Sequence, residues 1–299
     1  GSNLCSDVLK NHDVKSLTIV DNLLSSDVVN LPNSKKMQFI FGSIADNEVL
    51  NKITDEYDYI FHLACYHGNQ SSINNPFADH KNNTITSLKL FDHIKSFKRL
   101  DKIVYAGAGC SVAEKMYGNA KATYEDSPVS LFQDSPYSIS KIIGEMYGNY
   151  YFSQYGLRIV KARFQNIYGP REILGAGQWR GTKNTIWRNV VPTFIWKSLN
   201  GEQLPIENGG KASRDFIYVD DIVEGLILCA LKGEPGEVFN LATGSEYRII
   251  DLANLINSIT GNKADLEFKP ARSWDNSGNR YGAINKSQRL LGFISKTNI

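Results

Sequence analysis

Cysteine is scarce in this 299-residue chain, and its cysteines stand far apart. The four are Cys5, Cys65, Cys110 and Cys229, and no two of them form a C-x-x-C pair. This spacing argues against a disulfide framework and against a zinc site, because both are built from short motifs of cysteine or histidine. We predict that the chain binds no metal and that Cys5 and Cys229 are buried free thiols that behave as small apolar groups.

The chain also lacks a strong net charge and a long apolar run. Its 33 Lys and Arg residues nearly balance its 31 Asp and Glu residues, so the formal net charge is only +2. Such a weak field gives no reason to expect nucleic acid or an anionic membrane as a partner. No apolar run approaches the roughly 20 residues that cross a bilayer, and we see no signal peptide. We predict a cytoplasmic protein without a membrane partner.

Short apolar stretches alternate with amphipathic stretches through the first half of the chain. The apolar stretches predict β-strands, and the amphipathic stretches predict helices. The predicted strands are 16–22, 37–44, 57–65, 101–109 and 157–169. The predicted helices are 2–12, 46–53, 79–96 and 136–155. This alternation is typical of the doubly wound α/β class, in which crossover helices connect parallel strands.

Five polar or thiol side chains stand at the carboxyl ends of these predicted strands. They are Asp21, Ser43, Cys65, Cys110 and Asn166. In doubly wound folds, ligands bind in the crevice outside the carboxyl ends of the strands. We therefore expect the five side chains to line one crevice.

The composition changes from residue 170 onward. Residues 170–184 are rich in glycine and polar side chains and predict a long loop. A helix over 185–201, a strand followed by a helix over 213–233, and a helix over 251–261 come next. We interpret this part of the chain as a second, smaller region that covers the crevice.

A tyrosine and a lysine four residues apart are the strongest catalytic candidates. The pattern occurs twice, at Tyr117/Lys121 and at Tyr137/Lys141. The first lies among glycine and asparagine with no apolar period, so we interpret it as a chance match. The second follows Ser135, a predicted N-cap, and Pro136 at the first helical position, which places both side chains on one helix face.

The chemistry that uses such a pair is base catalysis by a phenolate. A free phenol has a pKa near 10, which is too high for a base at neutral pH. A lysine ammonium one turn away favours the phenolate and lowers the pKa. An amphipathic helix with a snorkelling lysine gives the same pattern without any catalysis.

Nine short stretches, in their order and spacing, resemble the extended short-chain dehydrogenase/reductase family, and within it the NAD-dependent nucleotide-sugar epimerases and dehydratases. They are GSNLC (1–5), VDN (20–22), FHLAC (61–65), NNT (82–84), SPYSISK (135–141), RFQNIYGP (163–170), RNVVPTF (188–194), RDFIYVDDIVEGL (214–226) and ARSWDNSGNRYG (271–282). The resemblance implies a Rossmann-type fold with an NAD-binding domain and a smaller nucleotide-sugar-binding region. The NAD-binding domain would comprise residues 1–165 and 212–240, and the smaller region residues 166–211 and 241–299.

The resemblance also implies that NAD is the cofactor. Asp21 would accept hydrogen bonds from the ribose hydroxyls and repel a 2′-phosphate, which favours NAD over NADP. Lys141 would hold the nicotinamide ribose as well as assist Tyr137. The implied cofactor-binding residues are Gly1, Asp21, Asn22, Ser43, Ile44, Leu63, Ala64, Cys65, Tyr137, Lys141 and Phe164.

A nucleotide sugar is the implied substrate. The residues implied to bind it are Asn166, Asn189, Val190, Arg214 and Arg272, with the two arginines on the diphosphate. Tyr137 would take a proton from a sugar hydroxyl while NAD takes the hydride from the same carbon. We expect epimerisation at C4. Other outcomes remain open, namely epimerisation at C3 or C5, dehydration, decarboxylation, simple reduction, or a catalytically silent binding module.

The resemblance also predicts a homodimer, because members of the family often pair through the helix that corresponds to the Tyr137 helix.

The chain departs from the family pattern in three places. The first departure is at the start: Gly1 matches the last glycine of the family's Gly-rich loop, so we expect a first strand and two glycines before it. The second is at the end, because the family usually continues with one more helix after the position of residue 299. The third concerns the end of the strand predicted over 101–109. Ala108 stands where the family carries a catalytic Ser or Thr. Cys110 lies where GDP-mannose 3,5-epimerases carry a proton-moving cysteine, so we expect Cys110 to carry a proton or Ser111 to replace the missing hydroxyl.

Overall fold

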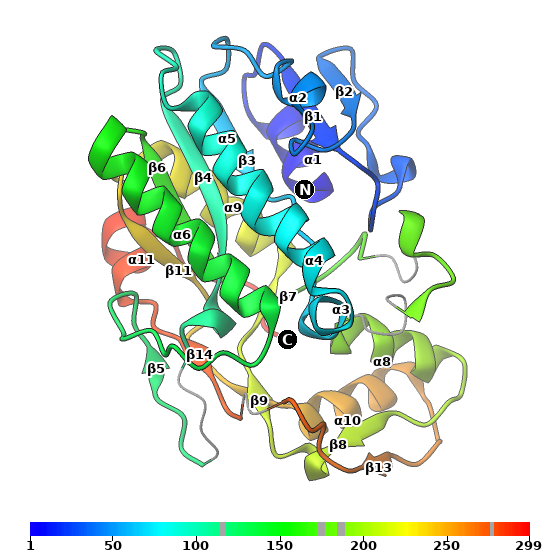
Figure 1. The fold of residues 1–299 in the computed structure, drawn as a ribbon. Coiled ribbons are helices and arrows are strands. Elements are labelled where there is room, and N and C mark those ends of the chain that lie inside the picture. Colours follow the sequence, from blue (N-terminus) through cyan, green and yellow to red (C-terminus); the bar gives the residue numbers. More distant parts are fainter. Residues whose placement is uncertain (114–117, 173–176, 184–188, 276–277) are drawn as a thin grey trace.

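A parallel β-sheet between two layers of helices forms the upper part of the molecule (Figure 1). The computed structural model describes residues 1–113, 118–172, 177–183, 189–275 and 278–299. The four strands lie in the order β11 (Val238–Leu241), β6 (Ile159–Phe164), β4 (Lys102–Ala108) and β3 (Tyr59–His62). Strands β1 (Leu17–Asp21) and β2 (Met37–Phe41) form a separate parallel pair. The predicted doubly wound α/β class is confirmed.

The stretch 157–169 forms two strands where the sequence predicts one. β6 ends at Phe164, and β7 (Asn166–Tyr168) pairs in parallel with β10 (Phe216–Tyr218) outside the central sheet. The backbone N–H of Asn166 donates to the carbonyl of Asp215 at 2.9 Å. The side chain of Gln165 therefore lies at the break between the two strands, on the edge of the crevice.

Helices lie on both faces of the sheet and in the lower part of the molecule (Figure 1). They are α1 (Ser2–Asn11), α2 (Asn47–Leu50), α3 (Asn69–Asn74), α4 (Pro76–Asp79), α5 (Thr86–Ile94), α6 (Pro136–Tyr155), α8 (Val190–Leu199), α9 (Val219–Lys232), α10 (Ile249–Thr260) and α11 (Asn285–Leu291). Residues 184–188, the start of the helix predicted over 185–201, lie outside the described residues. None of the helices in the described ranges has the length and apolarity to cross a membrane.

The predicted helix 79–96 contains a wide turn that the sequence pattern does not show. A π-helix over His80–Ile85 separates α4 from α5. The side chain of Asn83 is buried there and bonds to both backbone groups of Tyr66. The wider turn therefore lets a polar side chain reach the loop that follows β3.

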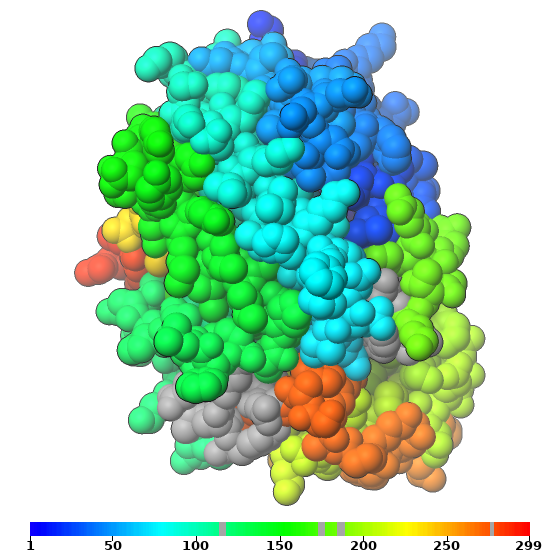
Figure 2. Space-filling model, in the orientation of Figure 1, coloured from blue at the N-terminus to red at the C-terminus, as the bar shows by residue number. Residues whose placement is uncertain are grey.

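The shorter elements complete the lower region and its junction with the sheet. The remaining strands are β5 (Ala122–Thr123), β8 (Pro205–Glu207), β9 (Ser213–Arg214), β12 (Tyr247–Arg248), β13 (Glu267–Lys269) and β14 (Tyr281–Gly282). The short 3-10 turns are η1 (Val28–Asn30), η3 (Gly109–Ser111), η4 (Gly177–Trp179) and η5 (Asn208–Gly210). In Figure 2, residues near 200 and near 265 lie side by side at the bottom, as the pairing of β8 with β13 requires.

Within the described part of the chain, three apolar clusters hold these layers together. Two pack on opposite faces of the central sheet, one beneath α9 and the other beneath α5 and α6. The third joins α8 and α10 to Leu204 and Ile206 in the lower region. Leu291 and Phe293, at the end of the chain, pack into the first cluster beside α9. This part of the predicted region 241–299 thus belongs to the core of the sheet, and the other boundaries stay predictions.

Helix α6 lies unusually close to the sheet because glycines face it. A Cβ atom at Gly144 would lie 2.0 Å from the Tyr105 hydroxyl, and one at Gly148 would lie 2.9 Å from Ile159 Cδ1. A buried ion pair between Arg163 and Glu145, with 2.8 Å between Nη2 and Oε2, ties the helix to β6. This close packing places the residues one turn earlier, around 141, against the end of β4.

Replacement of Gly144 tests this packing. We expect Gly144→Ala to lower the free energy of unfolding by about 1–3 kcal/mol, because the new methyl group overlaps a buried tyrosine. Ser153→Ala, at an exposed position of the same helix, is the control and should stay within about 0.5 kcal/mol of the parent. Urea unfolding measures both, and equal stability of the two variants would contradict the close approach.

Candidate active site

A crevice of about 580 Å³ runs along the carboxyl ends of the parallel strands. Asp21 ends β1, Ser43 follows β2, Cys65 follows β3, Cys110 follows β4 and Asn166 follows β6. All five line the crevice. The expectation that these strand ends meet at one site is therefore confirmed, because parallel strands bring their carboxyl ends to the same edge.

Most of the site residues predicted from the sequence line this crevice. They are Gly1, Asp21, Asn22, Ser43, Ile44, Leu63, Ala64, Cys65, Cys110, Tyr137, Lys141, Phe164, Asn166 and Asn189. Their individual roles stay predictions, since the crevice shows position and not function.

Ser111 and Val190 lie outside the crevice lining. Ser111 is 3% exposed, and its buried hydroxyl finds no hydrogen-bond partner within the described ranges. The 3-10 turn at the end of β4 carries its side chain inward while that of Cys110 lines the crevice. Val190 packs against the apolar cluster of the lower region. The geometry thus gives no support to Ser111 as a replacement hydroxyl or to Val190 as a substrate contact.

The two arginines predicted to hold a diphosphate also lie outside the crevice lining. The guanidinium of Arg214 donates to the carbonyls of Ser213 and Gly278. Arg272 pairs with Glu207 and lies over the ring of Trp274. Both side chains are thereby held on β9 and on the loop after β13, away from the strand ends.

Tyr137 and Lys141 lie on the crevice face of α6. Ser135 accepts a hydrogen bond from the backbone N–H of Ser138 and Pro136 begins the helix, so the predicted helix start is confirmed. The Lys141 Nζ lies 5.8 Å from the centre of the Tyr137 ring and donates to the carbonyl of Ala106 at 3.0 Å. Tyr117, of the other Tyr-x-x-x-Lys pattern, lies outside the described residues.

The pKa of Tyr137 differs from the sequence-based expectation. Burial raises it well above the usual value, and the negative charges that Cys65 and Cys110 can carry raise it further. The net shift is therefore upward, opposite to the lowering expected from Lys141, because burial is the largest effect on the phenol. Any phenolate at Tyr137 thus forms against a desolvation cost.

The opposite end of the crevice has the chemistry of a ribose site. Asp21 Oδ1 accepts from the N–H of Leu23 at 2.7 Å and from the hydroxyl of Ser26 at 2.8 Å. No described residue donates to Oδ2, which remains as an acceptor for a ligand hydroxyl. The apolar side chains of Val20 and Ile44 line the crevice beside it.

The middle of the crevice suits an anion. Residues 1–4, the first turn of α1, line it, and a helix N-terminus presents unpaired N–H groups and a positive dipole end. A Cβ atom at Gly1 would touch nothing within 4 Å, so the space there is open. The crevice therefore fits NAD. It offers a carboxylate for the ribose, a helix start for the diphosphate and the Tyr137–Lys141 pair at the reacting end.

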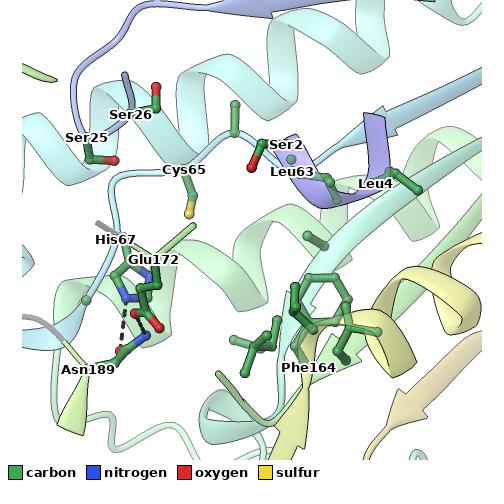
Figure 3. A pocket seen from close by; sticks show the side chains of 18 of the residues that line it. Ser2, Leu4, Ser25, Ser26, Leu63, Cys65, His67, Phe164, Glu172 and Asn189 are labelled. Atoms are coloured by element: carbon green, nitrogen blue, oxygen red, sulfur yellow. Dashed lines mark hydrogen bonds between the residues drawn. The ribbon is translucent and has the colours of Figure 1, made fainter. Parts of the chain in front are cut away.

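A thiol–imidazole pair, which the sequence analysis did not identify, also lines the crevice; Figure 3 labels its members, Cys65 and His67. The Cys65 thiol lies close enough to His67 for each to alter the pKa of the other, and the His67 ring lies 6.1 Å from that of Tyr137. Burial raises the pKa of Cys65, but the Lys141 charge and the interaction with His67 outweigh burial and lower it to about 7. Burial disfavours the charged form of His67, yet the interaction with Cys65 raises the pKa of the ring above its usual value.

Asn189 and Glu172 extend this pair across the crevice (Figure 3). The His67 Nε2 lies 3.2 Å from Asn189 Oδ1, which can only accept a hydrogen bond, so Nε2 carries the proton. The Asn189 amide in turn donates to Glu172 at 2.6 Å. The i, i+2 spacing of Cys65 and His67 was a visible signal, but their partners lie more than 100 residues away in the sequence.

The cluster does not have the composition of a metal site. Within the described part of the chain, no three Cys, His, Asp or Glu side chains gather where they could hold an ion. The cluster instead sets the charge and tautomer of a thiol and an imidazole beside Tyr137.

Comparison with known families places this crevice among NAD-linked enzymes. The sequence profile described as "NAD dependent epimerase/dehydratase family" matches residues 1–242. Among curated relatives, a trifunctional UDP-glucose 4,6-dehydratase, 3,5-epimerase and reductase of Arabidopsis thaliana is 28% identical over 99% of this chain and 43% of its own length. The chain thus spans less than half of that relative.

Two further similarities cover most of both partners. A UDP-glucose 4-epimerase of Mycolicibacterium smegmatis is 30% identical over 86% of this chain and 78% of its own length. The solved structure of the Bordetella bronchiseptica enzyme WbmF in complex with NAD⁺ and UDP is 53% identical, with a TM-score of 0.88, over 100% of this chain and 85% of that one.

The pH dependence of Cys65 reactivity tests the geometry of the thiol–imidazole pair. In a Cys110→Ser background, we expect the rate of Cys65 alkylation by iodoacetamide to rise up to about pH 7 and then level off, because only the thiolate reacts. His67→Ala should move the plateau to higher pH by removing one of the interactions that lower the pKa. Mass spectrometry of the modified peptide measures the rate, and a rate still rising at pH 9 in the parent would contradict the pairing.

Proposed function

The chain belongs to the NAD-dependent epimerase/dehydratase family, and from that premise we propose that it epimerises C4 of a UDP-sugar. The observation that carries the proposal is the single crevice, which has the ribose-type carboxylate of Asp21 at one end and Tyr137 with Lys141 at the other. The similarity to a UDP-glucose 4-epimerase and to an enzyme solved in complex with NAD⁺ and UDP supports the choice of C4 and of a UDP-sugar.

The residues of the chain have distinct tasks in this proposal. NAD, when bound, supplies the acceptor and donor of the hydride at C4. Tyr137 accepts the proton of the 4-hydroxyl as the carbon is oxidised and returns it when the ketone is reduced on its other face. Lys141, buried one turn away, supplies the positive charge that stabilises the phenolate.

Cofactor and sugar have separate supports in this arrangement. Asp21 and the first turn of α1 would hold the adenosine ribose and the diphosphate of NAD. His67 and Asn189 line the wall beside Tyr137, where their fixed hydrogen bond keeps the imidazole in one orientation. This side of the crevice would thus stay in place while the 4-keto sugar rotates to present its other face to NAD.

We also propose the homodimer that the sequence predicts. Support comes from large apolar side chains on the outer face of α6, such as Met146, which is 57% exposed, and Tyr150, which is 49% exposed. Figure 2 shows the surface of this helix running uncovered across the front of the molecule. The cytoplasmic location stays a prediction.

The phenol of Tyr137 is the group to remove first. We expect Tyr137→Phe to lower kcat about 10²–10⁴-fold while NAD and UDP-glucose still bind, because the ring remains and only the base is lost. Conversion of UDP-glucose to UDP-galactose measures kcat, and calorimetry measures binding. A variant that keeps more than about a tenth of the parent rate would overturn the assignment.

Proton exchange at C3 or C5 is the second candidate reaction. It is favoured by one observation, namely that Cys110, and not Ser111, lines the crevice together with Tyr137. Once C4 is a ketone, the C–H bonds at C3 and C5 become acidic, and the Cys110 thiolate is placed to take one of these protons. The proton returned to the other face of the carbon would invert it.

Deuterium exchange separates the two reactions. In deuterated water, C3/C5 epimerisation by the parent should place deuterium at C3 or C5, and Cys110→Ala should abolish this exchange while C4 oxidation continues. Epimerisation at C4 alone should leave C3 and C5 unlabelled in both proteins. Proton magnetic resonance of the recovered sugar reads both outcomes, and full exchange in Cys110→Ala would remove the thiol from the mechanism.

A further inference from the structure

Arg280 is a buried cation for which the described part of the chain provides no anionic partner. The side chain is 8% exposed and lines the crevice. Among the described residues, its Nε has no hydrogen-bond partner and no carboxylate forms an ion pair with the guanidinium. A buried charge without a partner is costly for the folded protein, and such groups are normally paired. A ligand anion is the partner that the crevice admits.

The neighbouring carboxylate Asp215 does not neutralise this charge. It is fully buried and accepts hydrogen bonds from Thr243, from the backbone N–H of Gly244 and from the backbone N–H of Gly282. These bonds hold the start of β14, and with it Arg280, in place beside the crevice. The guanidinium is thus positioned by its backbone and keeps its donors for a ligand.

Arg280 lies at the Tyr137 end of the crevice and not at the Asp21 end. The Gln165 side chain contacts the segments on both sides of it. A Cβ atom built on Gly109 would lie 2.1 Å from the Gln165 Nε2, and one built on Gly282 would lie 2.9 Å from it. Gln165 thus lies between the end of β4, which carries Cys110, and the strand that follows Arg280. Cys110, Gln165, Arg280 and Tyr137 all line the crevice.

The position of the reacting carbon determines which anion Arg280 meets. In a nucleoside-diphosphate hexose the diphosphate is attached to C1, across the ring from C4. The carbon outside the ring, C6, is attached to C5 and is next to C4. An anion site beside the residues that act at C4 therefore meets the substituent at C6 rather than the diphosphate.

We propose that Arg280 binds the carboxylate of a nucleoside-diphosphate hexuronate, so that the substrate is a sugar acid and not a neutral hexose. This inference rests on the proposed function, since it takes Tyr137 as the base at C4. A guanidinium offers two parallel N–H donors that match the two oxygens of a carboxylate. The Gln165 amide on the same wall offers a further donor.

Binding of three probes to the NAD-loaded enzyme tests the proposal. UDP-glucuronic acid carries the carboxylate, UDP-glucose lacks it, and UDP carries the diphosphate alone. We expect the parent to bind UDP-glucuronic acid at least 10-fold more tightly than UDP-glucose. Arg280→Gln should weaken UDP-glucuronic acid about 10–100-fold, the range for lost hydrogen bonds to a charged group, and change the other two less than about 3-fold.

Two further variants control for structure. Arg99→Gln, which removes a cation from an exposed ion pair, should leave all three affinities unchanged. Arg280→Lys keeps the charge but loses the fork, so it should bind UDP-glucuronic acid more weakly than the parent and more tightly than Arg280→Gln. The melting temperature of Arg280→Gln should not fall, because an unpaired buried charge is removed.

The outcomes that contradict the proposal are distinct. Equal weakening of all three probes in Arg280→Gln would assign the arginine to the diphosphate, and unchanged affinities or a parent that prefers UDP-glucose would exclude a carboxylate site. One further result would refute the proposed C4 epimerisation but leave the carboxylate site at Arg280 standing. In that case UDP-glucuronic acid would bind through Arg280, but the parent would leave C4 of both sugar probes unchanged.

Discussion

The buried amide of Asn83 connects the three segments on which the site depends. Its oxygen accepts from the N–H of Tyr66 at 2.6 Å, and its nitrogen donates to the carbonyl of Tyr66, to Asp79 and to the hydroxyl of Ser140. Tyr66 lies between Cys65 and His67, and Ser140 lies next to Lys141. One side chain thereby holds the loop after β3 against α6, and the π-helical turn exists where this side chain reaches inward.

The close contact held by Asn83 has an electrostatic consequence. Tyr137, Lys141, Cys65 and His67 share a half-buried space in which each charge alters the others. The lysine and the imidazole lower the pKa of the thiol, whereas the thiol raises the pKa of the phenol. Which group holds the proton therefore depends on the occupant of the crevice, because a ligand that excludes water changes all of these interactions together.

The parts of the fold that follow from local pattern were predictable, and those that follow from tertiary contact were not. Apolar strands and their carboxyl ends place Asp21 and Cys110 at one edge because parallel topology requires it. The break at Gln165 depends instead on a backbone bond to Asp215, and the inward turn of Ser111 depends on a 3-10 turn. The pairing of His67 with Asn189 joins residues 122 positions apart, which a single sequence cannot relate.

The charges along the crevice differ from end to end, and this difference fixes how ligands can lie in it. The Asp21 carboxylate at one end repels anions and accepts from hydroxyl groups, and the helix start in the middle attracts phosphate. At the other end, the guanidinium of Arg280, which pairs with no carboxylate of the described residues, would attract a second anion under the proposal above. A substrate with a carboxylate on its sugar would therefore be oriented by Arg280, with the carbons next to that carboxylate facing the phenol of Tyr137. A neutral sugar has no such constraint, so under the hexuronate proposal Arg280 would contribute orientation as well as affinity.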